Sequence, residues 1–117
     1  MDIEWVRRHC LSFPHATERV QWGDNLVFKV ADKIFAILAL EPGGQFLCCK
    51  CSPEEFAELV ERPGIIQAPY FARAQWVALE REDALNAAEL KQLVARSYEL
   101  VVEKMPKAKQ AALKKKA

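Results

Sequence analysis

The alternation of apolar and polar positions predicts one short helix and then four short strands in the first half of the chain. Residues 2–12 carry apolar positions at helical spacing, namely Ile3, Val6 and Cys10. Phe13-Pro14 ends this pattern, because the residue before a proline avoids the helical region. Extended patterns separated by polar turns then predict strands at 17–22, 26–30, 34–40 and 45–51. Short turns between consecutive strands favour an antiparallel meander.

The second half predicts two more helices and one more strand. Two capping boxes mark helix starts, Ser52 with Glu55 and Asn86 with Glu89. The first of these helices ends near Arg62, and the second is the longest and runs to about Met105. Between them, residues 65–75 read as an irregular connection with some extended character, and residues 75–80 as the last strand. No linker divides these elements.

Together these elements predict a two-layer α+β fold. Its antiparallel sheet would consist of the four-strand meander and a fifth strand, packed against the N-terminal, middle and C-terminal helices. We expect one domain over residues 1–106, followed by a basic tail over 107–117 that is flexible. A chain of 117 residues with 51% apolar residues can bury a core without disulfides.

Charge changes this picture only at the C-terminal end. The net charge is +1, which is lower than usual for proteins that bind nucleic acid chiefly through phosphates. Residues 104–117 nevertheless contain no acid and six lysines, so the rest of the chain is net acidic. This stretch is interpreted as a solvated end, and a phosphate-binding arm is the alternative.

The composition also bears on location. No apolar run reaches the roughly 18 residues of a membrane span, and the first residues lack the apolar region of a secretory signal. Three of the four cysteines, Cys48, Cys49 and Cys51, crowd one strand, which is a poor disulfide framework. We therefore expect a cytoplasmic protein with no membrane partner.

Catalytic and metal-binding patterns are weak throughout the sequence. Cys49 and Cys51 share a strand face, but their side chains would diverge too far for a tetrahedral metal, so no metal and no cofactor are expected. Cys10 and His15 could form a nucleophilic pair, yet no orienting partner is evident, and both histidines are predicted to be surface residues. Ser97 lacks a nucleophile elbow and is expected to bond back to the Leu93 carbonyl. The sequence favours a non-enzymatic protein.

Basic and aromatic residues recur together in the predicted sheet region. The basic ones are Lys29, Lys33, Lys50 and Arg73, and the aromatic ones are Trp22, Tyr70, Phe71 and Trp76. On one surface, such residues can hold nucleic acid by phosphate contacts and base stacking. They can equally be strand-edge charges above an aromatic core.

Four segments in this order resemble the MmcQ/YjbR-like family of small bacterial proteins. They are VQWGDNLVFKVADKIFAIL (20–38), FLCCKCSPEEFAEL (46–59), APYFARAQWVAL (68–79) and LKQLVARSYELV (90–101). The resemblance implies a CyaY-like or secretion-chaperone-like α+β fold and a DNA-binding role through a double wing of hairpins. The positions that match the family pattern are Trp22, Lys33, Lys50, Tyr70, Trp76, Ser97 and Tyr98. Some members carry a histidine where this chain has Phe71-Ala72-Arg73, and the lysine-rich end lies outside the pattern.

The leading hypothesis is a non-enzymatic DNA-binding module. We expect the ligand to contact Trp22, Lys29, Lys33, Lys50, Tyr70, Arg73, Trp76 and Tyr98. Two alternatives stay open. The sheet face could bind a protein partner or a second copy of the chain, or a cleft lined by Trp, Lys and Tyr residues could bind a small ligand.

Overall fold

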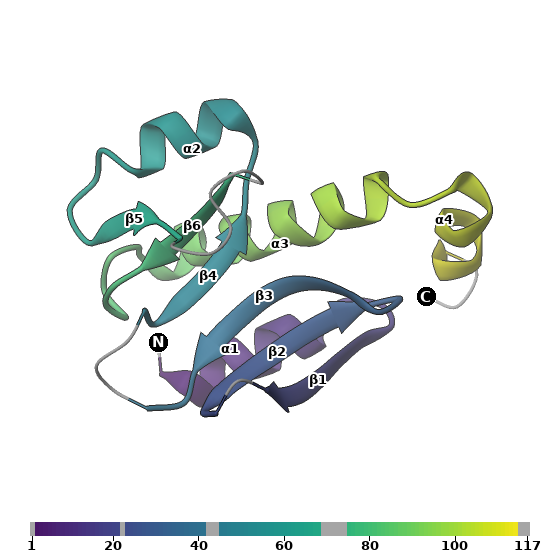
Figure 1. Cartoon of the computed structure of the whole chain (residues 1–117), viewed down its shortest axis with the longest axis horizontal. Helices are drawn as coiled ribbons and strands as arrows, with labels where there is room; N and C mark the ends of the chain where they lie inside the picture. Colours follow the sequence, from purple (N-terminus) through teal and green to yellow (C-terminus); the bar gives the residue numbers. More distant parts are fainter. Residues whose placement is uncertain (1, 22, 42–44, 69–74, 115–117) are drawn as a thin grey trace.

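The computed structural model describes residues 2–21, 23–41, 45–68 and 75–114. They form a six-stranded sheet in the order β1-β2-β3-β4-β6-β5, in which every neighbouring pair is antiparallel (Figure 1). Helices cover one face of this sheet. The predicted α+β fold is therefore confirmed.

The first four strands are the predicted meander. Their bounds are β1 (Ala16–Gln21), β2 (Asn25–Val30), β3 (Lys33–Ala39) and β4 (Leu47–Lys50). A two-residue turn joins β2 to β3, and its residues Ala31 and Asp32 have φ of 48° and 66°, as in tight hairpin turns whose twist matches the strands. The predicted last strand is β6 (Trp76–Leu79), which pairs with β4.

The structure adds a strand that the sequence pattern did not predict. Residues 65–75 were expected to be an irregular connection with some extended character, and Ile65–Gln67 within it form β5, which pairs with β6 at the sheet edge. A three-residue strand is too short to show an alternating pattern. Its pairing with β6 identifies it.

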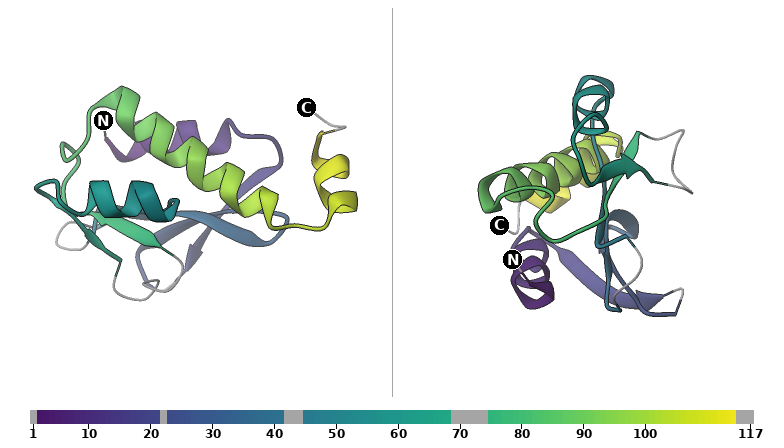
Figure 2. Two further views of the ribbon diagram at one scale, coloured as in Figure 1. Left: turned by 90° about the horizontal axis from the view of Figure 1, so that it is seen from above. Right: turned by 90° about the vertical axis from the view of Figure 1, so that its left-hand side faces the viewer.

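Three helices lie on the same face of the sheet, as the left view of Figure 2 shows. They are α1 (Ile3–Leu11), α2 (Pro53–Leu59) and α3 (Ala87–Glu103). Both capping boxes are present, with Ser52 and Asn86 each accepting a hydrogen bond from the backbone of the glutamate three residues later. Each of these helix starts depends on residues close together in the sequence, which explains why the sequence predicted them correctly.

A fourth helix, α4 (Lys107–Lys114), occupies much of the predicted tail. Its Gln110 side chain donates to the backbone oxygens of Glu103 and Met105 at 3.3 and 2.8 Å, which satisfies carbonyls at the end of α3. The Leu113 oxygen lies 3.1 Å from His15 Nε2, and the Leu113 side chain packs against the core. Helix α4 thus folds back toward the start of β1.

The core lies between the sheet and the helices. Its fully buried large side chains include Phe28 and Phe35 from the sheet and Leu90 from α3. A smaller buried cluster covers the other face of the sheet and consists of Val27, Ile37, Ala68, Trp76 and Ala78. We call the face that carries this cluster the outer face.

Strands β3 and β4 diverge after a short ladder, and Ser97 of α3 bridges them where they separate. The ladder of these strands covers only Ala36 to Leu38 of β3, paired with Cys49 to Leu47 of β4. One residue further on, the fully buried Ser97 hydroxyl accepts from the Lys50 backbone N–H at 2.9 Å and donates to the Phe35 carbonyl at 2.6 Å. The expected bond from Ser97 to the Leu93 carbonyl is therefore wrong. The Lys50 N–H and the Phe35 carbonyl lie beyond the end of the β3–β4 ladder. Without the Ser97 hydroxyl, these backbone groups would lack a partner, which explains why Ser97 bonds to them.

Candidate anion-binding site

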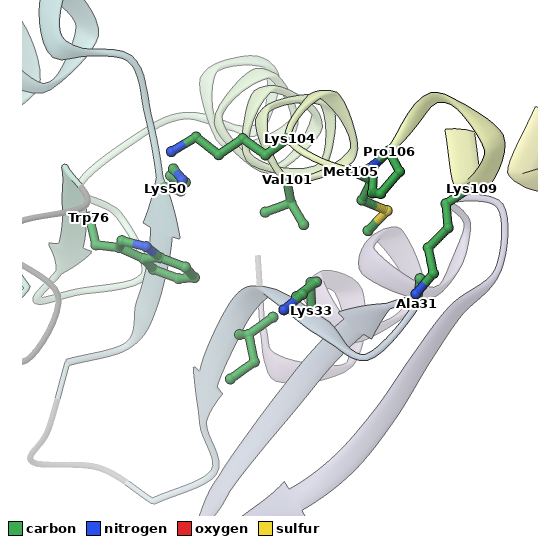
Figure 3. Close-up of a pocket in the computed structure, with 10 residues that line it drawn as sticks. Ala31, Lys33, Lys50, Trp76, Val101, Lys104, Met105, Pro106 and Lys109 are labelled. Atoms are coloured by element: carbon green, nitrogen blue, oxygen red, sulfur yellow. The ribbon is translucent and has the colours of Figure 1, made fainter. Parts of the chain in front are cut away.

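A pocket of about 510 Å³ lies where β3 and β4 diverge. Its walls come from the β2–β3 hairpin, the last residue of β4, the first residue of β6, the last turn of α3 and the start of α4 (Figure 3). The lining residues are Ala31, Lys33, Ile34, Lys50, Trp76, Val101, Lys104, Met105, Pro106 and Lys109. We call this hollow the lysine pocket.

Four lysines from four different elements line the lysine pocket. Lys33 begins β3 after the hairpin turn, Lys50 ends β4, Lys104 is the C-cap of α3 and Lys109 lies in α4. The described residues that line the pocket include no carboxylate. The hollow is therefore a region of positive potential, and walls of low dielectric strengthen such a field.

Lys50 is the least exposed of these lysines. Partial burial, together with the hydrogen-bonding contact and the charge of Lys104, lowers the pKa of Lys50 to about 8. Figure 3 shows the amino groups of Lys50 and Lys104 close together. Two ammonium groups held near each other repel, so an anion placed between them would relieve an unfavourable interaction.

The fold fixes the position of Lys50 from two sides. Its backbone N–H donates to Ser97 Oγ, and Lys50 is paired directly with Trp76 across β4 and β6. The lysine therefore projects from an ordered strand end on the outer face. Because these contacts already fix the backbone at Lys50, ligand binding does not have to order this strand end.

Trp76 forms an apolar wall of the lysine pocket. Its side chain is 5% exposed and belongs to the buried cluster of the outer face. Base stacking needs an exposed ring face, so this tryptophan does not provide a broad stacking platform.

The structure brings together three of the residues that the sequence nominated, Lys33, Lys50 and Trp76. Lys29 lies nearby on the outer face, where it pairs with the lining residue Ile34. Tyr98 lies elsewhere, because its ring stacks on Phe13 and its hydroxyl donates to the Pro14 carbonyl at 2.7 Å. Trp22, Tyr70 and Arg73 fall outside the described residues.

Sequence reasoning missed Lys104 and Lys109 as residues of a site. Both belong to the acid-free stretch after residue 103, which was interpreted chiefly as a solvated end. The acid-free run of lysines, whose alternative interpretation was a phosphate-binding arm, was the sequence signal that could have identified them. Only the return of α4 toward the hairpin places Lys109 beside the pocket.

The cysteines and histidines do not form a second site within the described residues. Cys10, Cys49 and Cys51 are buried, and burial raises the pKa of Cys10 and of Cys51 to about 12, so both thiols are poor nucleophiles. His15 is exposed as expected, but His9 is not a free surface residue, since its ring lies against Trp5 and Phe13. No group of three or more metal-ligating side chains occurs in the part of the chain that the structure describes.

The fold and the pocket define a small α+β domain. Helices cover one face of its sheet, and a basic hollow lies where β3 and β4 diverge. The YjbR family model matches residues 11–100. The chain belongs to the YjbR family, and the resemblance seen in the sequence is confirmed.

Solved structures show the same fold. A Deinococcus radiodurans protein, DR2400, with a DUF419 domain, aligns with a TM-score of 0.82 and 26% identity, over 95% of this chain and 86% of that one. A Pseudomonas syringae protein aligns with a TM-score of 0.69 and 22% identity, over 86% of this chain and 98% of that one. A comparison with curated proteins finds no match. Separately, no helix among the described residues is long and apolar enough to cross a membrane.

Proposed function

We propose that this protein binds DNA through its phosphates, with the lysine pocket as the central contact. The observation that carries the proposal is that four lysines line one hollow whose described lining contains no carboxylate. Ammonium groups that replace the counterions of phosphates supply most of the affinity in non-specific DNA binding. The modest net charge of +1 is compatible with this role, because the basic groups are concentrated.

Further basic residues extend the contact beyond the pocket. Lys29 and Arg19 lie on the outer face, since Lys29 pairs with Ile34 and Arg19 pairs with Val27. With Lys33 at the hairpin, they would follow a nucleic-acid backbone across this face. The hairpin then serves as a wing that touches phosphates.

Sequence-specific readout has little support at this site. Lysines contact phosphates as point charges, and Trp76 is too buried to stack broadly on a base. We therefore expect weak dependence on DNA sequence and a strong dependence on salt.

Fluorescence anisotropy with labelled duplex and single-stranded DNA, at about 50 and about 200 mM salt, tests the proposal. We expect the double variant Lys50→Ala/Lys104→Ala to weaken binding and to reduce the slope of log affinity against log salt by about 2, roughly 1 for each lysine that no longer neutralises a phosphate. Lys91→Ala is the matched control, because Lys91 lies on α3 about 20 Å along the helix axis from Lys104.

Two results would contradict the proposal. One is the absence of DNA binding by the unmodified protein at low salt. The other is an equal loss of affinity in the pocket variant and in the Lys91→Ala control, which would assign binding to overall charge and not to the pocket. Thermal unfolding of each variant checks that the fold is retained.

A further inference from the structure

We propose that the lysine pocket binds a terminal phosphate, that is, the phosphomonoester dianion at a nucleic-acid strand end or on a nucleotide. This inference rests on the proposed function, because it assigns the pocket's preferred ligand within the same DNA-binding site. Strand ends and free nucleotides share the phosphomonoester chemistry. Separate oligonucleotide and mononucleotide probes distinguish these two sources.

The shape of the pocket favours an end over the middle of a strand. A hollow of about 510 Å³ is within the usual range for small-ligand sites, and its walls come from the β2–β3 hairpin, β4, β6, α3 and α4. A phosphodiester within a strand carries a nucleoside on both sides, so its phosphate contacts mainly the rim of a concave site. A terminal phosphate has one free side and can approach the half-buried Lys50 more closely.

The charge of the pocket favours a dianion. Four lysines line it, and the amino groups of Lys50 and Lys104 are held close together. A phosphodiester brings one negative charge, whereas a phosphomonoester brings about −1.5 to −2 at neutral pH and three strong acceptor oxygens. The monoester therefore offers enough charge and enough acceptors for two neighbouring ammonium groups at once.

Partial burial strengthens this preference at Lys50. Burial and the neighbouring Lys104 disfavour the charged form of Lys50, and a bound anion would favour it. Electrostatic attraction is also stronger where water is partly excluded than at the rim of a surface. The part of the hollow near Lys50 and Lys104 is thus the preferred place for the phosphate.

The rest of the lining suits the body of a nucleotide. Ile34, Trp76, Val101 and Met105 form an apolar side of the pocket. A sugar or base edge could lie against these side chains while its phosphate contacts the lysines. Binding pockets commonly combine such an apolar wall with a few placed polar groups.

The test compares two single-stranded DNA oligonucleotides of the same sequence, one with a 5′-phosphate and one with a 5′-hydroxyl. We expect the phosphorylated strand to bind the full-length protein about tenfold more tightly, as an added charge-assisted contact implies. A nucleoside monophosphate and the matching nucleoside, measured by calorimetry, form the second pair of probes. The nucleotide should bind and the nucleoside should not.

Variants assign the preference to the pocket. Lys50→Met/Lys104→Met should abolish the difference between the two strands, and Lys91→Met should retain it. If the double variant does not fold, Lys109→Met provides a second test, because Lys109 is exposed on α4 and its loss should reduce the difference without affecting the core.

The outcomes separate this inference from DNA binding itself. Equal, salt-sensitive affinity for both strands would overturn the terminal-phosphate site and leave the DNA-binding proposal standing. Binding of the nucleotide alone, with no binding of either strand, would support the site and overturn DNA binding. Failure of every probe to bind would overturn both.

Discussion

Ser97 shows how one side chain can complete a sheet. Where β3 and β4 separate, its hydroxyl accepts from the Lys50 N–H and donates to the Phe35 carbonyl. One small polar group thereby satisfies two strand backbones and connects both to α3. It also holds the strand end that carries Lys50 at the pocket.

We predict that Ser97→Ala destabilises the protein by about 1–3 kcal/mol, because it leaves a buried donor and a buried acceptor without partners. Urea unfolding measures this loss of free energy. Ser12→Ala is the control: the Ser12 hydroxyl donates to the His9 carbonyl at the exposed end of α1, where water can replace it, so the cost should be below that of Ser97→Ala. Equal costs for both serines would show that the bridge between the strands is not important.

Lys50 links the chemistry of the pocket to pH. The pKa of Lys50 is lowered to about 8, first by burial and then by Lys104. The charged form is therefore disfavoured in the folded state, which reduces stability below pH 8. This cost disappears as the pH rises from about 8 toward the ordinary lysine value of 10.5.

Phosphate binding should show the opposite dependence on pH. We predict that affinity for a nucleoside monophosphate falls as the pH rises from about 7 to about 9, because Lys50 loses its charge while the phosphate stays a dianion. The charged groups that face Lys50 from the described lining are Lys33, Lys104 and Lys109. Calorimetry at three pH values measures the effect, and Lys50→Met should flatten it. An unchanged slope in that variant would exclude Lys50 as the titrating group.

At the scale of elements, helices and turns marked by residues close together in the sequence were predicted. Elements that depend on contacts between distant residues were not. The capping boxes of α2 and α3 and the turn between β2 and β3 involve residues within a few positions of each other, and these were predicted from the sequence. Strand β5 and helix α4 were not. A short edge strand is identified by its pairing with β6, and α4 by its docking near His15 and the end of α3.

Helix α4 contributes more to the site than to the fold. Its Gln110 and Leu113 are half-buried, while Lys107, Ala108, Lys109, Ala111 and Ala112 are exposed. The flexibility expected for residues 107–117 stays a prediction. What the structure adds is that Lys109 reaches the lysine pocket from this helix.

We predict that truncation after Pro106 keeps the fold and weakens DNA binding several-fold. The loss of stability should be about 1 kcal/mol, because the partly buried Leu113 is the main apolar group removed. Circular dichroism and urea unfolding measure the fold, and anisotropy measures binding. Lys109→Ala removes the charge of Lys109 and keeps α4 in place. Leu113→Ala weakens the packing of α4 against the core and keeps that charge. Full affinity in the truncated chain would exclude α4 from the site.

At the scale of the molecule, the described surface offers little for an apolar protein partner. Its exposed large hydrophobic residue is Val20, at 58% exposure. Permanent protein interfaces are usually larger and more apolar than this. The edge strand β1 also carries the charged residues Glu18 and Arg19, which discourage pairing with another sheet.

We therefore predict that the protein is a monomer in solution. Sedimentation equilibrium at micromolar concentration should give a mass near 13.3 kDa, with no increase at high salt. A dimer that persists in high salt would instead support the interaction module that the sequence left open. Arg19→Glu, which reverses a charge on the β1 edge, would then show whether that edge is the interface.

The sequence by itself determined the fold class, most of the elements and the family. These follow from apolar periodicity, turn residues and helix caps, which depend on neighbours within a few positions. Only the tertiary structure decided that Ser97 bridges two diverging strands and that Lys33, Lys50, Lys104 and Lys109 share one hollow. These lysines come from separate elements, so their proximity depends on how the sheet opens and how α3 and α4 pack against it. No local pattern encodes that packing, because it results from the burial of the whole core.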